Sequence, residues 1–226
     1  MISNDKRIRI ITGHYGSGKT EFSVNYVTAL KEVSDRKVAI ADLDIVNVYF
    51  RSREKKKEME DQGIYVISSS IEGAGLDVPA VSAAITTPVK DKSCDYVIDL
   101  GGNDVGTKVL GRIIPLLQPE EVDFFMVVNT YRPNTSTPEG VIEQMRNLEA
   151  ASGLKVTGFI NNTNLIRETT AACLADGDAI LKEVTKRTGV PVKYVSYVEE
   201  LLTEEIPQGL AGELFPMKFY MRKSWM

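Results

Sequence analysis

Residues 8–20 read Ile-Arg-Ile-Ile-Thr-Gly-His-Tyr-Gly-Ser-Gly-Lys-Thr, an apolar run that leads directly into a glycine-rich loop ending in lysine and threonine. The loop, from Gly13 to Thr20, matches the pattern G-x-x-x-x-G-K-[ST] in full, and a segment of helical period follows it. A strand, loop and helix in this order bind phosphate, because backbone N–H groups and the positive end of the helix face the phosphate oxygens. We therefore expect Lys19 to reach the β- and γ-phosphates of a nucleotide and Thr20 to ligate Mg²⁺.

Short apolar runs, rich in β-branched and aromatic residues, recur along the chain at 8–12, 38–41, 64–67, 96–98, 124–128, 156–160 and 192–195. They mostly lack polar alternation, which is typical of strands covered on both faces. With helical segments between them, the runs predict an α/β fold: a doubly wound, mostly parallel sheet of about seven strands with helices on both faces. Ligands of such sheets bind beyond the carboxyl ends of the strands.

Three of the intervening segments have apolar residues at three- and four-residue spacing, which predicts amphipathic helices. Capping hydroxyls, a first-turn proline and closing glycines mark the helix ends. The predicted faces and limits are Phe22, Tyr26, Leu30 and Val33 for the first helix; Val141, Met145 and Leu148, between Ser136 or Thr137 and Gly153, for the second; and Leu174, Leu181 and Val184, from about Glu168 to Gly189, for the third.

Length and composition fit one globular domain spanning residues 1–226, with 43% hydrophobic and 26% charged residues. The net charge of −4 lacks the overall excess of basic residues that is typical of proteins that bind nucleic acid with much of their surface. Two distant cysteines, Cys94 and Cys173, exclude a disulfide framework and zinc-type spacing. No apolar run is long enough to span a bilayer, and the amino terminus does not resemble a signal peptide. We expect a soluble cytoplasmic protein.

Two groups of acidic residues follow predicted strands. Asp99 ends the stretch Asp-Tyr-Val-Ile-Asp and precedes Gly101 and Gly102, whose backbone N–H groups could reach a γ-phosphate. Asp42 and Asp44 end the second strand and, at alternating positions, point to the same side of an extended chain. Each carboxylate could instead cap the turn that follows it. Beside a phosphate-binding loop, we expect them to face Mg²⁺ and the attacking water.

In their order and spacing, the loop at 13–20, the acidic pair at 42–44 and the segment 95–102 resemble the MinD/ParA/CobQ-type P-loop ATPases of the SIMIBI class. The resemblance implies that Asp44 orients the hydrolytic water, that Asp42 lies near the metal and that Asp99 is the Walker B carboxylate. It also implies an ATP-driven switch or Mg²⁺-dependent ATPase that acts on a partner protein. Alternatives within the class are an ATP-dependent phosphotransferase or ligase of the dethiobiotin synthase or cobyrinate amidation type; a further alternative is a scaffold that binds nucleotide without hydrolysing it.

In the same class, the loop after the sixth strand reads the base. Here that loop is Asn161-Asn162-Thr163-Asn164. A guanine-specific N-K-x-D loop needs a carboxylate at its last position, where this sequence has Asn164. ATP is therefore favoured over GTP, with Asn161 or Asn162 contacting adenine, although asparagines are also ordinary turn residues.

The sequence departs from the family at the signature lysine, where it has His14, its only histidine, and at the next glycine, where it has Tyr15. The resemblance therefore does not carry over a lysine that reaches across an ATP-sandwich dimer, and a homodimer is left open. The imidazole of His14 could donate to phosphate, or it could face solvent or stack on Tyr15. The nucleotide-binding residues that we predict are Gly13, His14, Tyr15, Gly16, Ser17, Gly18, Lys19, Thr20, Glu21, Gly101, Asn161 and Asn162; the catalytic ones are Lys19 and Asp44; and the metal ligands are Thr20, Asp42 and Asp99.

The carboxyl-terminal residues 214–226 mix aromatic and basic side chains, as do the membrane-targeting helices of MinD-like proteins. Because Pro216 interrupts this short segment, we expect a helix or tail packed against the domain, without membrane contact.

Overall fold

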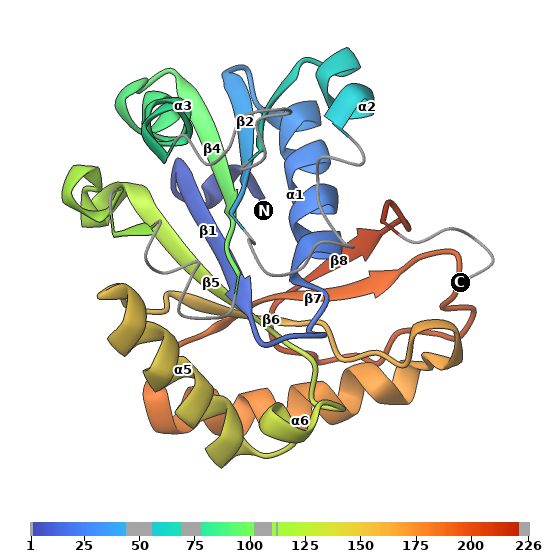
Figure 1. The fold of residues 1–226 in the computed structure, drawn as a ribbon. Coiled ribbons are helices and arrows are strands. Elements are labelled where there is room, and N and C mark those ends of the chain that lie inside the picture. Colours follow the sequence, from blue (N-terminus) through green and yellow to red (C-terminus); the bar gives the residue numbers. More distant parts are fainter. Residues whose placement is uncertain (1, 44–55, 69–77, 102–109, 112, 222–226) are drawn as a thin grey trace.

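A computed structural model describes residues 2–43, 56–68, 78–101, 110–111 and 113–221. They form an eight-stranded sheet in the order β3-β2-β4-β1-β5-β6-β7-β8, in which every neighbouring pair is parallel (Figure 1). The strands are β1 (Ile8–Gly13), β2 (Lys37–Asp42), β3 (Ile64–Ser68), β4 (Cys94–Asp99), β5 (Val122–Val128), β6 (Gly158–Asn161), β7 (Val192–Val198) and β8 (Glu213–Met217). The predicted parallel α/β fold is confirmed, with one strand more than the seven expected.

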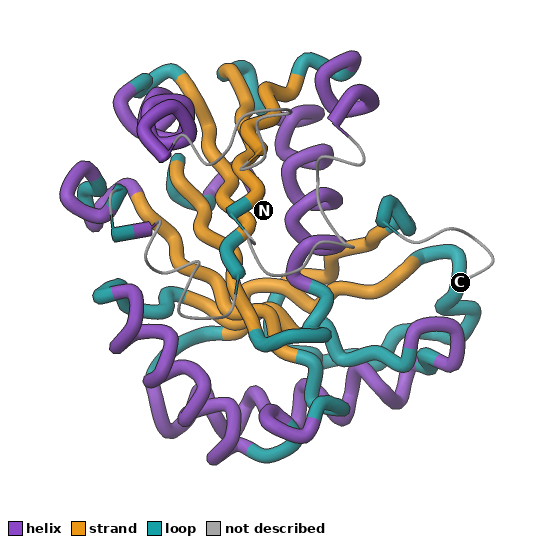
Figure 2. Tube along the Cα trace, in the orientation of Figure 1, coloured by secondary structure: helices purple, strands orange, loops and turns teal. Residues whose placement is uncertain are grey.

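Helices cover both faces of the sheet (Figure 2). The helices are α1 (Lys19–Val33), α2 (Lys56–Asp61), α3 (Val78–Lys90), α5 (Pro138–Ser152) and α6 (Ala171–Thr188), with short 3-10 turns that include η5 (Pro133–Thr135) and η6 (Ile166–Glu168). One apolar core joins the sheet to α3, α5 and α6, and a second joins its other face to α1, α2 and the end of the chain. Within the described residues, no helix is long and apolar enough to cross a bilayer.

The helix ends follow the capping chemistry of the sequence. The Thr137 hydroxyl accepts from the Gly140 N–H at the start of α5, and Gly153 ends that helix in the left-handed region with φ 70°. The third predicted helix begins at Ala171, after the cap Thr170, rather than near Glu168. Val33 was wrongly placed on the buried face of α1: its side chain is 56% exposed, because it lies in the last turn, beyond the edge of the core.

The chain end was also predicted incorrectly in part. Residues 214–217 of the expected helix or tail belong to β8, which pairs with β7 at the edge of the sheet. Pro216 lacks an N–H group, but an edge strand needs donors on one side only and tolerates this. The sequence pattern missed the strand because a proline argues against a strand wherever its place in the sheet is unknown.

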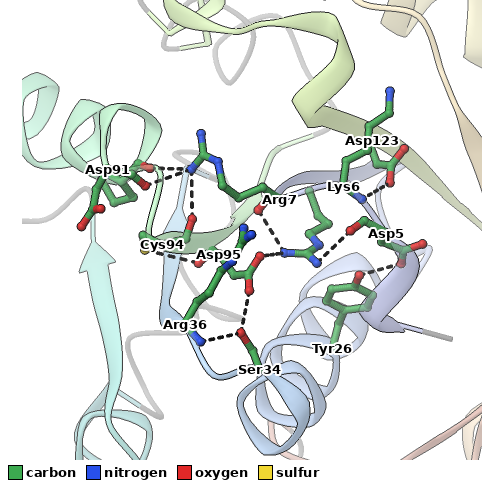
Figure 3. A network of polar contacts seen from close by, with 12 residues as sticks. Asp5, Lys6, Arg7, Tyr26, Ser34, Arg36, Asp91, Cys94, Asp95 and Asp123 are labelled. Atoms are coloured by element: carbon green, nitrogen blue, oxygen red, sulfur yellow. Dashed lines mark hydrogen bonds and ion pairs between the residues drawn. The ribbon is translucent and has the colours of Figure 1, made fainter.

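A buried polar network lies at the amino ends of the central strands (Figure 3). Arg9 donates to Asp95 across a 2.7 Å ion pair, and the Ser34 hydroxyl donates to the second Asp95 oxygen at 2.6 Å. The Tyr26 hydroxyl donates to Asp5 at 2.7 Å. Because these buried charges are paired and hydrogen-bonded, the network joins α1 to the sheet without leaving an isolated charge. It lies at the end of the sheet opposite the phosphate-binding loop.

Candidate nucleotide-binding site

The glycine-rich loop joins the carboxyl end of β1 to the first turn of α1. Gly16 and Gly18 adopt left-handed backbone conformations, with φ of 77° and 86°, which glycine adopts without steric cost. The Ser17 N–H donates to the His14 carbonyl at 3.0 Å and closes the turn. The loop therefore has the curved backbone that directs N–H groups toward an anion, at the positive end of a 15-residue helix.

Two side chains from neighbouring connections hold this loop. Asn162, at the end of β6, donates from Nδ2 to the Ser17 carbonyl at 2.7 Å, and its Oδ1 accepts from the Ser196 hydroxyl at 2.9 Å. A β-carbon added at Gly18 would lie 2.3 Å from the same Nδ2 atom, so glycine is required there by contact as well as by conformation. Arg132, after β5, donates from Nε to the Gly16 carbonyl at 3.0 Å.

His14 is bonded within its own chain. Its Nδ1 lies 3.0 Å from the Tyr15 carbonyl, which can only accept, and its Nε2 lies 2.7 Å from the Asn134 amide nitrogen, which can only donate. In this pairing Nδ1 donates to the carbonyl and Nε2 accepts from the amide. The neighbouring Tyr15 is 72% exposed. The imidazole therefore joins the loop to η5 through Asn134.

Two of the three predicted acidic site residues, Asp42 and Asp99, lie in the described part of the chain, side by side at the carboxyl ends of adjacent strands. Asp42 on β2 and Asp99 on β4 are register partners, and the Leu43 N–H donates to the Asp99 carbonyl at 2.9 Å. Both side chains are buried. Ser23, one turn into α1, donates to Asp99 Oδ1 at 3.1 Å, which orients that carboxylate toward the helix that carries Lys19 and Thr20. Asp44 and Gly102 lie outside the described residues, and Gly101 is buried just after β4.

These oxygen donors fit a magnesium ion. Mg²⁺ takes one or two carboxylates and completes its coordination with phosphate oxygens and water. Thr20, Asp42 and Asp99 supply a hydroxyl and two carboxylates near the phosphate-binding loop. No group of three or more His, Cys, Asp or Glu side chains suited to a metal occurs in the described part of the chain, so a protein-only metal cage is not formed there.

A cleft of about 500 Å³ runs from the loop across the carboxyl ends of β6, β7 and β8. This volume is in the range of small-molecule sites. The described residues that line it are His14, Tyr15, Gly16, Gly18, Lys19, Thr20, Glu21, Arg132, Pro133, Asn162, Asn164, Ile166, Val198, Met217, Phe219 and Met221. Six of the predicted nucleotide-binding residues of the loop, together with Glu21 and Asn162, therefore share one cleft.

Asn161 does not belong to that lining. It is fully buried, its amide donates to the Leu174 carbonyl at 3.0 Å and its oxygen accepts from the Thr163 N–H at 3.2 Å. A β-carbon at Gly177 of α6 would lie 2.2 Å from that oxygen, so the helix packs directly on Asn161. The structure therefore does not place Asn161 at the cleft, because successive residues at the end of β6 face opposite sides of the sheet.

Sequence reasoning missed the residues that come from later connections, namely Arg132, Ile166, Val198, Met217 and Phe219. Arg132 could have been found, because it follows a predicted strand at the carboxyl edge of the sheet. Met217 and Phe219 could not, because the eighth strand was not predicted, and Ile166 and Val198 are apolar residues that belong to no motif. Ile166 has φ 62°, a costly conformation for a β-branched residue, at the wall of the cleft.

The fold and the loop together define an α/β protein with a P-loop NTPase-like fold. The structure is similar to FtsY from Mycoplasma mycoides, with a TM-score of 0.58 and 18% identity over 85% of this chain and 60% of that one. It is similar to the cell division protein FtsY from Thermotoga maritima, with a TM-score of 0.58 and 21% identity over 85% of this chain and 62% of that one. A third similar structure is the signal recognition particle receptor FtsY from Elizabethkingia anophelis in complex with GDP, with a TM-score of 0.56 and 20% identity over 90% of this chain and 61% of that one.

The chain thus spans about 60% of the length of these FtsY structures. No protein-family model matches the chain. No curated protein gives a significant match.

Proposed function

We propose that this protein is a Mg²⁺-dependent, ATP-binding molecular switch that hydrolyses ATP and acts on a partner protein. The observation that carries the proposal is the complete phosphate-binding loop, which lines the cleft, beside the paired carboxylates Asp42 and Asp99 at the ends of two neighbouring strands. A P-loop of the MinD/ParA/CobQ type, as the sequence resemblance implies, has its hydrolytic machinery at these positions.

In this proposal the loop backbone and Lys19 hold the β- and γ-phosphates, while Thr20, Asp42 and Asp99 would hold Mg²⁺. When bound, Mg²⁺ would neutralise part of the negative charge of the phosphates. Water attacks the γ-phosphorus, the bond to the β–γ bridging oxygen breaks, and ADP leaves with its new negative charge opposite Lys19. The proton lost by the water passes to the released phosphate or to solvent. Asp44 orients the water, a role that the sequence resemblance implies.

Two observations bear on whether the nucleotide carries adenine or guanine. The similar FtsY structure from Elizabethkingia anophelis contains GDP, which favours a guanine nucleotide. Against this, the loop after β6 offers Asn164, whose amide donates to the Asn162 carbonyl at 2.7 Å and whose oxygen accepts from the Ile166 N–H at 3.2 Å. The carboxylate in the described lining is Glu21, which already accepts backbone N–H bonds. Since guanine recognition needs a carboxylate for its N1–H and amino group, we favour ATP and keep GTP as the second candidate.

A partner protein is supported by the exposure of the loop itself. Tyr15 lies in the phosphate-binding loop yet projects into solvent, and Tyr131, 37% exposed, follows β5 close to Arg132. A protein that contacts Tyr15 would touch a residue directly adjacent to the bound phosphates. A second copy of this chain is one such partner, and the cytoplasm is the location that we propose.

The experiment is phosphate release from ATP by the purified protein with Mg²⁺, compared with the Asp44→Asn variant. We expect slow release that the variant lowers at least tenfold while ATP binding persists, because the substitution removes the charge that orients water. Asp61→Asn, at an exposed position of α2, is the matched control. Tight ATP binding without any release would favour the non-hydrolysing scaffold, and release that needs an added acceptor would favour a phosphotransferase.

A further inference from the structure

The carboxyl-terminal segment is hydrogen-bonded to the first two turns of α1, beside the phosphate-binding loop. We call residues 213–221, β8 and the four residues after it, the C-terminal strap. Asn25 and Lys218 exchange two hydrogen bonds, in which the Lys218 N–H donates to Oδ1 at 2.8 Å and Nδ2 donates to the Lys218 carbonyl at 2.9 Å. The Glu21 carboxylate accepts from the backbone N–H groups of Tyr220 and Met221. Glu21 directly follows Thr20, so the strap is attached one residue from the loop.

Aromatic packing against α1 and β7 also holds the C-terminal strap in place. The ring of Phe215 on β8 lies 5.1 Å from Phe22 and 6.1 Å from Tyr26 of α1, and 5.6 Å from Tyr194 of β7, measured between centroids. In Figure 1 the strand β8 runs beside the amino-terminal half of α1. The strap is therefore part of the folded domain and not a loosely attached tail.

This anchoring places three side chains of the strap in the cleft. Met217, Phe219 and Met221 are at alternating positions, and all three line it together with Val198 and Ile166. Met217 and Met221 are buried, whereas Phe219 is half-buried. Beside them, a smaller hollow of about 30 Å³ extends between β7 and the loop after β6. The cleft thus has a polar end at the loop and an apolar end at the strap.

The order of the strands fixes the direction of a nucleotide in this cleft. The loop follows β1, and the carboxylates Asp42 and Asp99 lie on the β4–β2 side of it. The open space lies on the other side, over β6, β7 and β8. A triphosphate held by the loop would therefore extend its nucleoside into this open space, toward the strap. Aromatic and methionine side chains pack well on the face of a base.

We propose that the C-terminal strap is part of the nucleotide site: Phe219, flanked by Met217 and Met221, forms the wall against which the base packs, and Glu21 holds that wall in position. The inference rests on the proposed nucleotide-binding function and adds to it the source of base affinity. It assigns to Glu21 the role of fastening the strap, in place of the direct nucleotide contact predicted from the sequence.

The test compares the affinities for ATP and for inorganic tripolyphosphate, which has the phosphates but no base, by calorimetry. Phe219→Ala should weaken ATP binding roughly tenfold, within the range seen for loss of one base–aromatic contact, and leave tripolyphosphate binding unchanged. Phe219→Tyr should retain ATP affinity, because its ring keeps the stacking face. Glu21→Ala should also weaken ATP binding without weakening that of tripolyphosphate, because it releases the wall and removes a negative charge near the phosphates.

Leu214→Ala is the matched control, since Leu214 lies on the same strap but its side chain is 44% exposed and outside the cleft. Equal ATP affinity in the wild type, Phe219→Ala and Glu21→Ala would overturn the inference, provided that the wild type binds ATP. Failure of the wild type to bind ATP or tripolyphosphate would instead overturn the proposed function. An equal loss of ATP and tripolyphosphate affinity in Phe219→Ala would also contradict the inference, because it would assign to Phe219 a structural effect on the loop.

Discussion

The side-chain amide of Asn162 donates a 2.7 Å hydrogen bond to the carbonyl oxygen of Ser17, and so joins the end of β6 to the middle of the phosphate-binding loop. The bond supports the curvature of the loop, whose N–H groups bind an anion in sites of this kind. The residue expected to contact a base is therefore, in this structure, a support for the loop.

Asn162→Ala should weaken ATP and tripolyphosphate binding to a similar extent, by about two- to tenfold, since it removes one buried hydrogen bond on which the loop depends. Calorimetry measures both affinities, and Asn147→Ala, at an exposed position of α5, is the matched control. A loss confined to ATP would show that Asn162 contacts the base after all.

Mg²⁺ should increase ATP affinity in the wild type, and in Asp42→Asn and Asp99→Asn this increase should be roughly tenfold smaller. The reason is that each substitution removes a charged oxygen donor. ATP affinity without Mg²⁺ should not fall, since the variants also remove negative charge near the phosphates. Titration with and without Mg²⁺ separates the two effects. An unchanged Mg²⁺ dependence in both variants would rule out the proposed metal position.

His14→Ala should leave nucleotide-dependent self-association unchanged, because both imidazole nitrogens are bonded within the chain, to Tyr15 and Asn134. Light scattering with a slowly hydrolysed ATP analogue measures it. If the wild type forms a dimer and the variant stays monomeric, His14 acts across the interface as the lysine of related ATPases does.

The stability of the protein should fall as the pH rises above about 10, where tyrosines of the unfolded chain ionise. Burial raises the pKa of Tyr26, Tyr96 and Tyr194 in the folded protein, so there the unfolded state binds fewer protons than the native state and unfolding is favoured. Each such tyrosine contributes up to about 1.4 kcal/mol per pH unit.

Tyr96→Phe should make this fall less steep, because it removes one buried phenol whose hydroxyl donates to the Ile85 carbonyl at 3.2 Å. Urea unfolding at several pH values between 8 and 11 gives the slopes. An identical slope in the wild type and the variant would mean that Tyr96 ionises as easily in the folded state as in the unfolded chain.

The sequence predicted the parts of the site whose chemistry is local. Gly16, Gly18 and Lys19 form a contiguous motif, and Asp99 follows an apolar strand, so spacing alone indicated where they lie. The direction in which side chains around β6 point was harder to predict. Asn161 and Asn162 are adjacent, and only the register of the strand shows that Asn161 faces α6 and Asn162 faces the loop.

The apolar half of the cleft was not predictable in this way. Phe219 lies 200 residues after Lys19, on a segment whose proline argued against a strand. Its position depends on β8 pairing with β7 and on Glu21 and Asn25 fastening the strap. Such contacts depend on tertiary packing, for which a single sequence gives no periodic signal.

The most direct test of the central claim is calorimetric titration of ATP and GTP, with Mg²⁺, into the wild-type protein and the Lys19→Ala variant. The account predicts that ATP binds to the wild type at least tenfold more tightly than GTP, and that Lys19→Ala weakens ATP binding about a hundredfold while its circular dichroism spectrum stays unchanged. Tighter binding of GTP would contradict the ATP assignment. Equal ATP affinity of a folded Lys19→Ala variant and the wild type would contradict the site itself.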